Sequence, residues 1–202
     1  MLSKHPTEKM SREVLQKYIT SILPMSTDKS AFFAEQFEPL EYSKDKLLLV
    51  ENKVTKDTFV LESGYVRSYT FDQNGEEVTT NIFSAPCFVN DFLSFFKQEL
   101  ASENYQCLTN CKLWTMNYEK VQICFHTYPE FREFGRMMLV TNYSILHHRM
   151  LGMIKDTAEN RYLKLMKNYP DIFQNVPLKI IASFLGITDT SLSRIRKKNT
   201  LK

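Results

Sequence analysis

The positively charged side chains of this chain gather near its carboxyl end. Between residues 178 and 202, one carboxylate, that of Asp189, stands against six cations: Lys179, Arg194, Arg196, Lys197, Lys198 and Lys202. The segment therefore carries a net charge of +5, whereas the whole chain carries only +3, so the remaining residues sum to −2. Lysine and arginine concentrated on one small element is the pattern that binding to nucleic-acid phosphates requires.

The spacing of residues in Val176–Lys198 predicts two short helices joined by a tight turn. Pro177 suits the first turn of a helix, where its missing N–H is not needed. Ile181 and Leu185 are four residues apart and share one face of that helix. Gly186 stands where the helix must stop and reverse, a conformation that glycine enters without a Cβ penalty.

The second helix of this segment is expected to begin after Thr188, a good N-cap residue, and to bury Leu192 and Ile195. Ala182 is small where two crossing helices would approach closely. These features together are typical of a DNA-binding helix-turn-helix. The alternative is an ordinary helical hairpin whose basic end is solvated.

The rest of the sequence has the composition of a globular protein with an ordinary core, in one large domain or two small ones. No apolar run is long enough to span a bilayer, and the polar residues 1–5 do not form a signal peptide. We expect no membrane association and a reduced, cytoplasmic setting. Neither a Ser-His-Asp order, a G-x-S-x-G motif nor a Walker loop occurs, so no enzymatic activity is expected.

No C-x-x-C pair occurs, so the sequence predicts neither a zinc site nor a disulfide framework among its four cysteines: Cys87, Cys107, Cys111 and Cys124. Cys107 and Cys111 are expected on one face of a single strand, about 13 Å apart at about 3.3 Å per residue. That separation is too large for a shared metal ion and favours packing as buried thiols. The adjacent His147 and His148 would diverge on a helix, so no metal site is expected there.

Ahead of the basic segment, helices are expected in residues 7–37, with Ser11 as an N-cap, and the pattern of residues 40–116 changes to short β runs. Asn74-Gly75 is a strong hairpin signal between two of these runs. The strand candidates are Leu47–Val50, Thr58–Leu61, Tyr65–Phe71, Glu76–Phe83 and Gln106–Met116. Many short strands separated by close turns favour an antiparallel roll or barrel.

The stretch Ala85–Asn104 has little strand character and favours a short helix with an aromatic face. Its phenylalanines, from Phe88 to Phe96, suit core packing; the alternative is that they line an apolar ligand pocket. Asn117 is expected to cap a helix that runs through Phe125.

A long helix is predicted from Pro129 to about Lys155, with apolar residues on more than one face. Such a helix needs two partners. One would be the β roll, and the other the same helix of a second subunit; a single buried helix in a monomer is the alternative. Thr157 is expected to cap a further helix that ends near Tyr169, with a domain boundary near Asp156.

This order of elements resembles the Crp/Fnr family of bacterial transcription regulators over nearly the whole chain. The most specific segments are Glu62-Ser63-Gly64-Tyr65-Val66-Arg67, Ala158-Glu159-Asn160-Arg161-Tyr162 and Val176–Lys198, of which the last is similar to short members from the Bacteroidetes lineage. The resemblance implies an α+β fold: an N-terminal antiparallel β roll (cyclic-nucleotide-binding-like, a double-stranded β-helix), a long dimerisation helix, and an all-α helix-turn-helix domain. The implied domains are residues 1–128, 129–156 and 157–202. Only Asn199–Lys202 remain for the family's wing, so little or no wing is expected.

The resemblance fails where the family's cyclic-AMP-binding members hold their ligand. They carry a Gly-Glu pair for the ribose and an Arg-Ser or Arg-Thr pair for the cyclic phosphate, since a buried phosphate needs a bidentate cation. Here those positions correspond to Pro86-Cys87 and to Ala101-Ser102, and no arginine lies between Arg67 and Arg132. The degenerate effector pocket would consist of Pro86, Cys87, Phe88, Ala101, Ser102 and Glu103. We therefore expect no cyclic nucleotide as a cofactor, and either another small-molecule effector or none.

The family likeness places Asp189, Thr190 and Arg194 at base-contacting positions of a recognition helix that spans Thr188 to about Lys198. Arg194 can take guanine O6 and N7 together, whereas Asp189 can accept from cytosine or merely strengthen the helix start. Phosphate contacts are expected from Ser191, Ser193, Arg196, Lys197 and Lys198. The implied partners are double-stranded DNA, a second copy of the chain and RNA polymerase. The competing hypothesis is a small-molecule-sensing or protein-interaction module whose terminal helical hairpin does not bind DNA.

Overall fold

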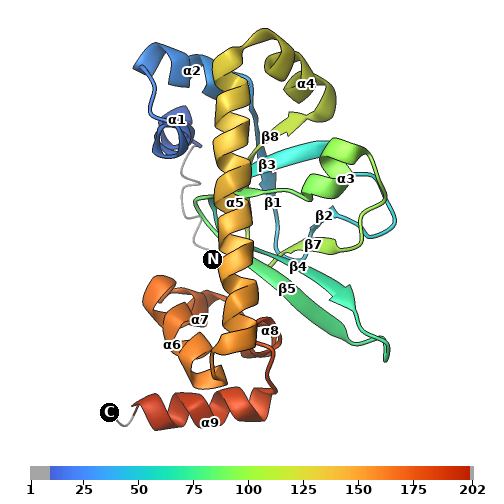
Figure 1. Ribbon diagram of the computed structural model, residues 1–202, viewed down its shortest axis with the longest axis vertical. Coiled ribbons are helices and arrows are strands. Elements are labelled where there is room, and N and C mark those ends of the chain that lie inside the picture. The colour runs from blue at the N-terminus through green and yellow to red at the C-terminus, as the bar shows by residue number, and fades with distance from the viewer. Residues whose placement is uncertain (1–9, 201–202) are drawn as a thin grey trace, which may run out of the picture.

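The structure is a computed structural model that describes residues 10–200. Residues 7–9 of the expected first helix, the polar start at residues 1–5 and the charge of Lys202 lie outside this range. Figure 1 shows one long helix along the major axis, with β sheets on one side of it and small helices at both ends.

The helices, in chain order, are α1 (Arg12–Ile22), α2 (Thr27–Glu35), α3 (Phe92–Lys97), α4 (Tyr118–Thr127), α5 (Pro129–Lys155), α6 (Ala158–Asn168), α7 (Ile172–Asn175), α8 (Leu178–Phe184) and α9 (Asp189–Thr200). The strands are β1 (Glu38–Tyr42), β2 (Leu47–Leu49), β3 (Asp57–Ser63), β4 (Tyr65–Phe71), β5 (Glu77–Ser84), β6 (Cys87–Val89), β7 (Asn104–Cys107) and β8 (Cys111–Asn117). The bounds of α5 agree with the predicted long helix.

The strands form two antiparallel sheets, ordered β1-β8-β3-β6 and β2-β7-β4-β5, which confirms the predicted roll. The roll interior is apolar and contains residues of both sheets, Leu61 and Leu113 from the first and Val66 from the second among them. The tip of the β4–β5 hairpin carries the predicted Asn74-Gly75, where the Asp72 carboxylate accepts hydrogen bonds from the backbone N–H of Asn74 (2.8 Å) and of Glu76 (3.0 Å). These hydrogen bonds also hold the pKa of Asp72 below its ordinary value.

A second apolar cluster lies where helices cover the roll. Strand β3 alternates between the two clusters: Val60 packs with the helices, whereas Leu61 faces the roll interior. The amino-terminal part of α5 supplies Phe131, Phe134 and Met138 to the helical cluster. Side chains expected as N-caps hold the surrounding helices in place, since Ser11, Asn117 and Thr157 each accept a backbone N–H of the first turn.

Three sequence predictions are wrong in detail. Gln106–Met116 is not one strand: β7 ends at Cys107, β8 begins at Cys111, and the two belong to different sheets. The stretch after Ala85 does contain a strand, β6, which pairs with β3, although the predicted short aromatic helix follows as α3. Pro177 lies one position before α8, with extended backbone, rather than inside its first turn.

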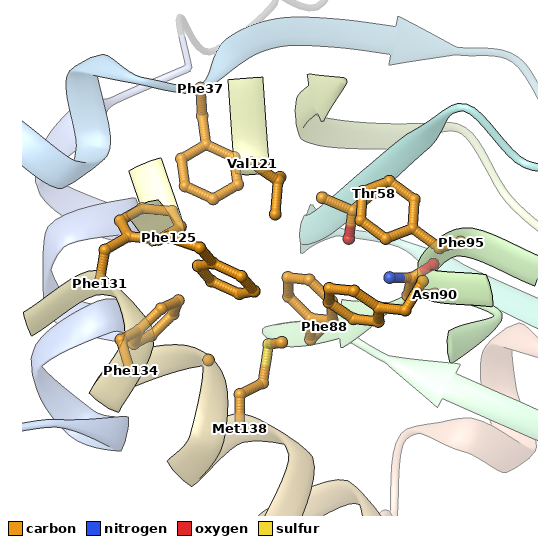
Figure 2. A pocket seen from close by; sticks show the side chains of 12 residues that line it. Phe37, Thr58, Phe88, Asn90, Phe95, Val121, Phe125, Phe131, Phe134 and Met138 are labelled. Carbon is orange, nitrogen blue, oxygen red and sulfur yellow. The ribbon is translucent and has the colours of Figure 1, made fainter. Parts of the chain in front are cut away.

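The predicted aromatic residues of the insert line a small cavity between the roll and helices α4 and α5 (Figure 2). Its volume is ≈ 20 Å³, about the space of one water molecule. Phe88, Phe95 and Phe96 meet the α5 side chains Phe131 and Phe134 around it. The remaining space is too small for an aromatic ligand. The phenylalanines therefore pack as part of the core, which is the alternative that the sequence favoured.

Two polar side chains point toward this aromatic cluster (Figure 2). Within residues 10–200, neither the hydroxyl of Thr58 nor the side-chain amide of Asn90 has a hydrogen-bond partner, although both residues are buried. A buried polar group without a partner costs about 1–3 kcal/mol. Both side chains should therefore lower the stability of this core.

Thr58→Val is accordingly expected to stabilise the protein by about 1 kcal/mol, because it replaces an unpartnered hydroxyl by a methyl group of the same shape on a β strand. Thermal unfolding followed by circular dichroism should show a melting temperature higher by about 2–4 °C. Thr80→Val is the matched control, since the Thr80 hydroxyl shares a 2.7 Å hydrogen bond with Ser68. The control should melt at a lower temperature than the parent, and a destabilised Thr58→Val would show that this hydroxyl has a partner in solution.

Candidate nucleic-acid interface and effector pocket

Helices α8 and α9 form the predicted pair of helices with a tight turn between them. Gly186 adopts the left-handed conformation expected of it, with φ of +66°, and the N–H of Ile187 donates to the carbonyl of Ala182 at 3.0 Å. The hydroxyl of Thr188 then accepts from the N–H of Ser191 at 3.2 Å, which confirms Thr188 as the N-cap of α9.

The two helices are held by an apolar cluster that also includes α6 and α7. Ile181, Ala182 and Leu192 are each at most 1% exposed, so the small residue and the apolar pairs lie at the helix crossing as predicted. Ile195 packs on the edge of the same cluster. The helix-turn-helix geometry is therefore present, with its second helix on the outside of the molecule (α9 in Figure 1).

The side of α9 opposite Leu192 is polar and exposed. The exposed residues of α9 include Asp189, Thr190, Ser193, Arg194, Lys197 and Lys198. Arg194 and Lys197 follow Thr190 by four and seven residues, which places these three on one helical face. This face has the charge and the side-chain types expected for the edge of a DNA major groove.

Two of the remaining predicted phosphate contacts have partners inside the protein. Lys198 donates to the carboxylate of Glu159 on α6 at 2.7 Å, and Glu159 also accepts from the side chain of Asn199. Ser191 shares a hydrogen bond with the Thr188 hydroxyl, while Arg196 is half-buried. Lys198, which is exposed and follows Arg194 by four residues, is therefore held by an ion pair at the edge of the exposed face, which centres on Arg194.

Substitution of Gly186 by alanine is expected to destabilise the helix-turn-helix by about 1–2 kcal/mol, the cost of left-handed backbone for a residue with a Cβ. The new Cβ would lie 2.6 Å from Cε of Met153, but that atom ends a flexible side chain and can move. Gly186→Asn should lose less stability, because asparagine tolerates this conformation better than alanine. Urea unfolding of the three proteins measures the order Gly, Asn, Ala; equal stability of all three would contradict the left-handed turn.

The helix-turn-helix rests on the β roll and on α5, through contacts that the sequence did not reveal. The Oγ of Ser183 on α8 accepts the backbone N–H of Thr79 on β5 at 2.8 Å. Arg149 of α5 donates to the carbonyl of Phe184 at 3.1 Å and lies 4.5 Å from the centre of its ring. Burial lowers the pKa of the Arg149 guanidinium, and the nearby carboxylate of Glu103 opposes that shift.

A second arginine completes this support. Arg161, in the Ala158–Tyr162 segment, donates to the carbonyls of Leu185 (3.1 Å) and Asp156 (2.7 Å). These donors satisfy the carbonyls at the ends of α8 and α5, where a helix leaves such groups without internal partners. Arginine recurs at such positions because its rigid fork donates to several acceptors at once.

From Leu139 to Met153, α5 presents an uncovered apolar stripe. Its members repeat at alternating intervals of four and three residues, with the exposed fraction in brackets: Leu139 (42%), Tyr143 (67%), Leu146 (62%), Met150 (48%) and Met153 (39%). That interval is the heptad spacing of a coiled-coil seam. We call these five residues the α5 stripe.

The predicted effector residues lie at the two ends of the β6–α3 insert. Pro86 precedes β6, Cys87 begins it, and Phe88 faces the helical cluster rather than the roll interior. Ala101 is buried, and its backbone is hydrogen-bonded to residues 52 and 53. Glu103 is half-buried. The six residues therefore do not surround one cavity.

Side chains fill the roll interior beside these residues. The rings of Phe83 and Tyr105 stack there with centroids 5.6 Å apart, and the space next to Tyr105 has a volume of only ≈ 10 Å³. Asp57 and Asp91 contribute carboxylates to its wall, and among the described residues no arginine or lysine lines it. A cyclic phosphate would meet negative rather than positive charge here. The Asp91 carboxylate also caps α3, because it accepts hydrogen bonds from the backbone N–H groups of Leu93 and Ser94.

Comparison with known proteins agrees with this architecture. Residues 39–128 match the family model of the cyclic nucleotide-binding domain. No curated protein matches the sequence. Across residues 10–200, no helix is both long and apolar enough to cross a membrane, and no group of three or more His, Cys, Asp or Glu residues is placed to hold a metal ion.

Solved structures share the fold over most of the chain. FixK2 from Bradyrhizobium japonicum has a TM-score of 0.67 at 14% identity, covering 80% of this chain and 83% of that one. CLP from Xanthomonas campestris, described as a c-di-GMP responsive global regulator, has a TM-score of 0.65 at 15% identity, with 87% and 92% covered. The catabolite activator protein of Thermus thermophilus has a TM-score of 0.55 at 15% identity, with 88% and 84% covered. These neighbours are Crp/Fnr-family regulators.

Proposed function

We propose that this chain, which has a cyclic nucleotide-binding-type roll within the fold of the Crp/Fnr regulators, is a homodimeric, sequence-specific DNA-binding transcription regulator. The observation that carries the proposal is the exposed face of α9, where Thr190, Arg194 and Lys197 lie opposite the buried Leu192. A helix anchored by one apolar face and cationic on the other is the arrangement that enters a major groove.

The α5 stripe supports the dimeric part of the proposal. Exposed apolar side chains at heptad spacing find a partner when a second copy of the helix packs against them. Pairing of two α5 helices would bring two α9 helices into one particle, and symmetric dimers read DNA as two half-sites. Because each subunit presents a single recognition helix, α9, the second head contributes a large share of the affinity.

We further propose that the effector, if the roll binds one, is not a cyclic nucleotide. The carboxylates of Asp57 and Asp91 and the stacked rings of Phe83 and Tyr105 support this part of the proposal. Calorimetric titration with cyclic AMP and with cyclic GMP is expected to give no heat of binding. A saturable isotherm in the micromolar range would overturn it.

The proposed function is tested by fluorescence anisotropy with duplex DNA from upstream of the protein's own gene, over a series of salt concentrations. We expect the logarithm of the binding constant to fall linearly with the logarithm of salt concentration, by about 0.9 for each phosphate contact. Light scattering on the same sample should give the mass of a dimer. A monomer that binds no duplex at low ionic strength would refute the proposed function. That result is the one expected of the competing hypothesis, a module whose terminal helical hairpin makes only protein contacts.

A further inference from the structure

The structure corrects the expectation that Cys107 and Cys111 lie far apart on one strand. They occupy the two ends of the β7–β8 turn, with three residues between them, and both side chains point into the roll interior. Cys107 is 0% exposed and Cys111 is 2% exposed, and both side chains belong to the same apolar cluster of the roll. A chain reversal between strands of different sheets is thus what brings these thiols together.

From this geometry we propose that Cys107 and Cys111 form a reversible intramolecular disulfide, so that the β7–β8 turn is a redox-sensitive modification site. The oxidant is a hydroperoxide such as hydrogen peroxide. Thr109 is half-buried and Asn110 is exposed at the turn, so a small molecule has only this short segment to displace.

The chemistry proceeds in two steps. The Cys111 sulfur attacks one oxygen of hydrogen peroxide, the O–O bond breaks, and the leaving hydroxide takes up a proton to become water, which leaves a sulfenic acid on Cys111. The Cys107 sulfur then attacks the Cys111 sulfur; the S–O bond breaks, and the leaving hydroxide takes the proton of the Cys107 thiol. In sum, two thiols lose two electrons and two protons, and one peroxide becomes two waters.

The two cysteines differ in a way that assigns these roles. Interaction with the Cys107 thiol lowers the pKa of the Cys111 thiol, and the same interaction, together with burial, raises the pKa of Cys107. Thiolate is the reactive form, so Cys111 reacts first and Cys107 resolves. Cys87 lies close by, but burial raises its pKa to about 12 and keeps it protonated.

The position of the turn gives the disulfide a structural consequence. The Cys111 thiol donates to the carbonyl of Tyr65 at 3.4 Å, and the N–H of Leu108 donates to the same carbonyl at 2.8 Å. Tyr65 and Leu108 both pack in the cluster that contains Ile181 and Leu192 of the helix-turn-helix. Oxidation removes the thiol donor and draws the ends of the turn together, which disturbs the surface on which α8 rests.

The disulfide can be mapped without ambiguity in the full-length protein. Cys107 and Cys111 fall in one tryptic peptide, residues 98–112, whereas Cys87 falls in residues 68–97. After treatment with hydrogen peroxide and alkylation, we expect peptide 98–112 to lose two hydrogen atoms and to recover them with dithiothreitol. A crosslink between the two peptides, an isolated sulfinic acid at Cys111, or thiols unchanged under conditions that oxidise free glutathione would each overturn the proposal.

The consequence is measured by hydrogen exchange of α8 and by DNA binding, the latter resting on the proposed function. Oxidation should accelerate exchange in α8 and weaken DNA binding by about tenfold, a usual coupling between two sites. Cys111→Ser should abolish both responses, whereas Cys124→Ser, in the other core cluster, should keep them. If the reduced protein binds no DNA, the proposed function is refuted, and peptide mapping and hydrogen exchange alone test the disulfide. If the disulfide is mapped but exchange in α8 is unchanged, the proposed effect of oxidation on α8 is refuted.

Discussion

Leu146→Glu is expected to convert the proposed dimer into a monomer. Leu146 is the central member of the α5 stripe and is 62% exposed, so the substitution leaves the folded subunit intact. In a paired seam, however, it sets two carboxylates against each other in an apolar contact. Juxtaposed like charges cost several kcal/mol, and the dimer dissociation constant should rise by at least about a hundredfold. Light scattering over a range of protein concentrations measures this change.

The matched control is Ile123→Glu on α4, because Ile123 is 63% exposed and lies outside the α5 stripe. It should leave the dimer unchanged. DNA affinity of the Leu146 variant should fall by about two to four orders of magnitude, as expected when a two-headed contact becomes a single one. A Leu146→Glu protein that stays dimeric would show that the subunits meet elsewhere, and equal losses in both variants would point to a general effect of added charge.

Arg194→Ala is expected to have the largest effect on sequence discrimination by α9. Arg194 is exposed at the centre of the polar face, and a guanidinium that reads guanine contributes about 1–3 kcal/mol. The best site should therefore be bound about 5- to 150-fold more weakly for each affected half-site, while binding to unrelated DNA changes less. Selection from a random DNA library, before and after the substitution, shows whether one base position loses its preference.

Two lysines serve as controls for this prediction. Lys197→Ala should weaken binding to all DNA alike and reduce the salt dependence by about one phosphate contact for each subunit. Lys198→Ala should have a smaller effect on affinity, because Lys198 is already ion-paired with Glu159. An Arg194→Ala protein that weakens all sequences equally would place Arg194 on a phosphate and not on a base.

Local signals allowed much of this fold to be predicted. Asn74-Gly75 and Gly186 mark positive-φ turns, and Thr188 supplies a capping hydroxyl within the same few residues. Such features depend on neighbours in sequence, so they can be predicted without tertiary information. The apolar pattern after Pro129 likewise predicted a long helix with apolar residues on more than one face. In the structure one of these faces is buried against the core, and the α5 stripe is exposed.

The errors arose where tertiary contacts decide. Cys107–Cys111 read as continuous strand because buried residues flank a turn of only three residues, and nothing local shows that the chain moves to the other sheet there. Ser183 and Arg149 gave no signal at all, since the contacts that give them a role, with Thr79 and Phe184, join residues 104 and 35 positions apart in sequence. The placement of the helix-turn-helix on the roll could therefore not be predicted from sequence alone.

The attachment of α8 to both β5 and α5 limits how the proposed dimer could meet its operator. Ser183 binds α8 to β5, and Arg149 binds α8 to α5. The recognition helix is therefore not free to reorient relative to the rest of its subunit. Adding one base pair between two half-sites turns one of them by about 34° around the duplex axis. A rigidly mounted pair of heads cannot follow that rotation without breaking one of these two attachments, and natural operators should accordingly keep a single spacer length.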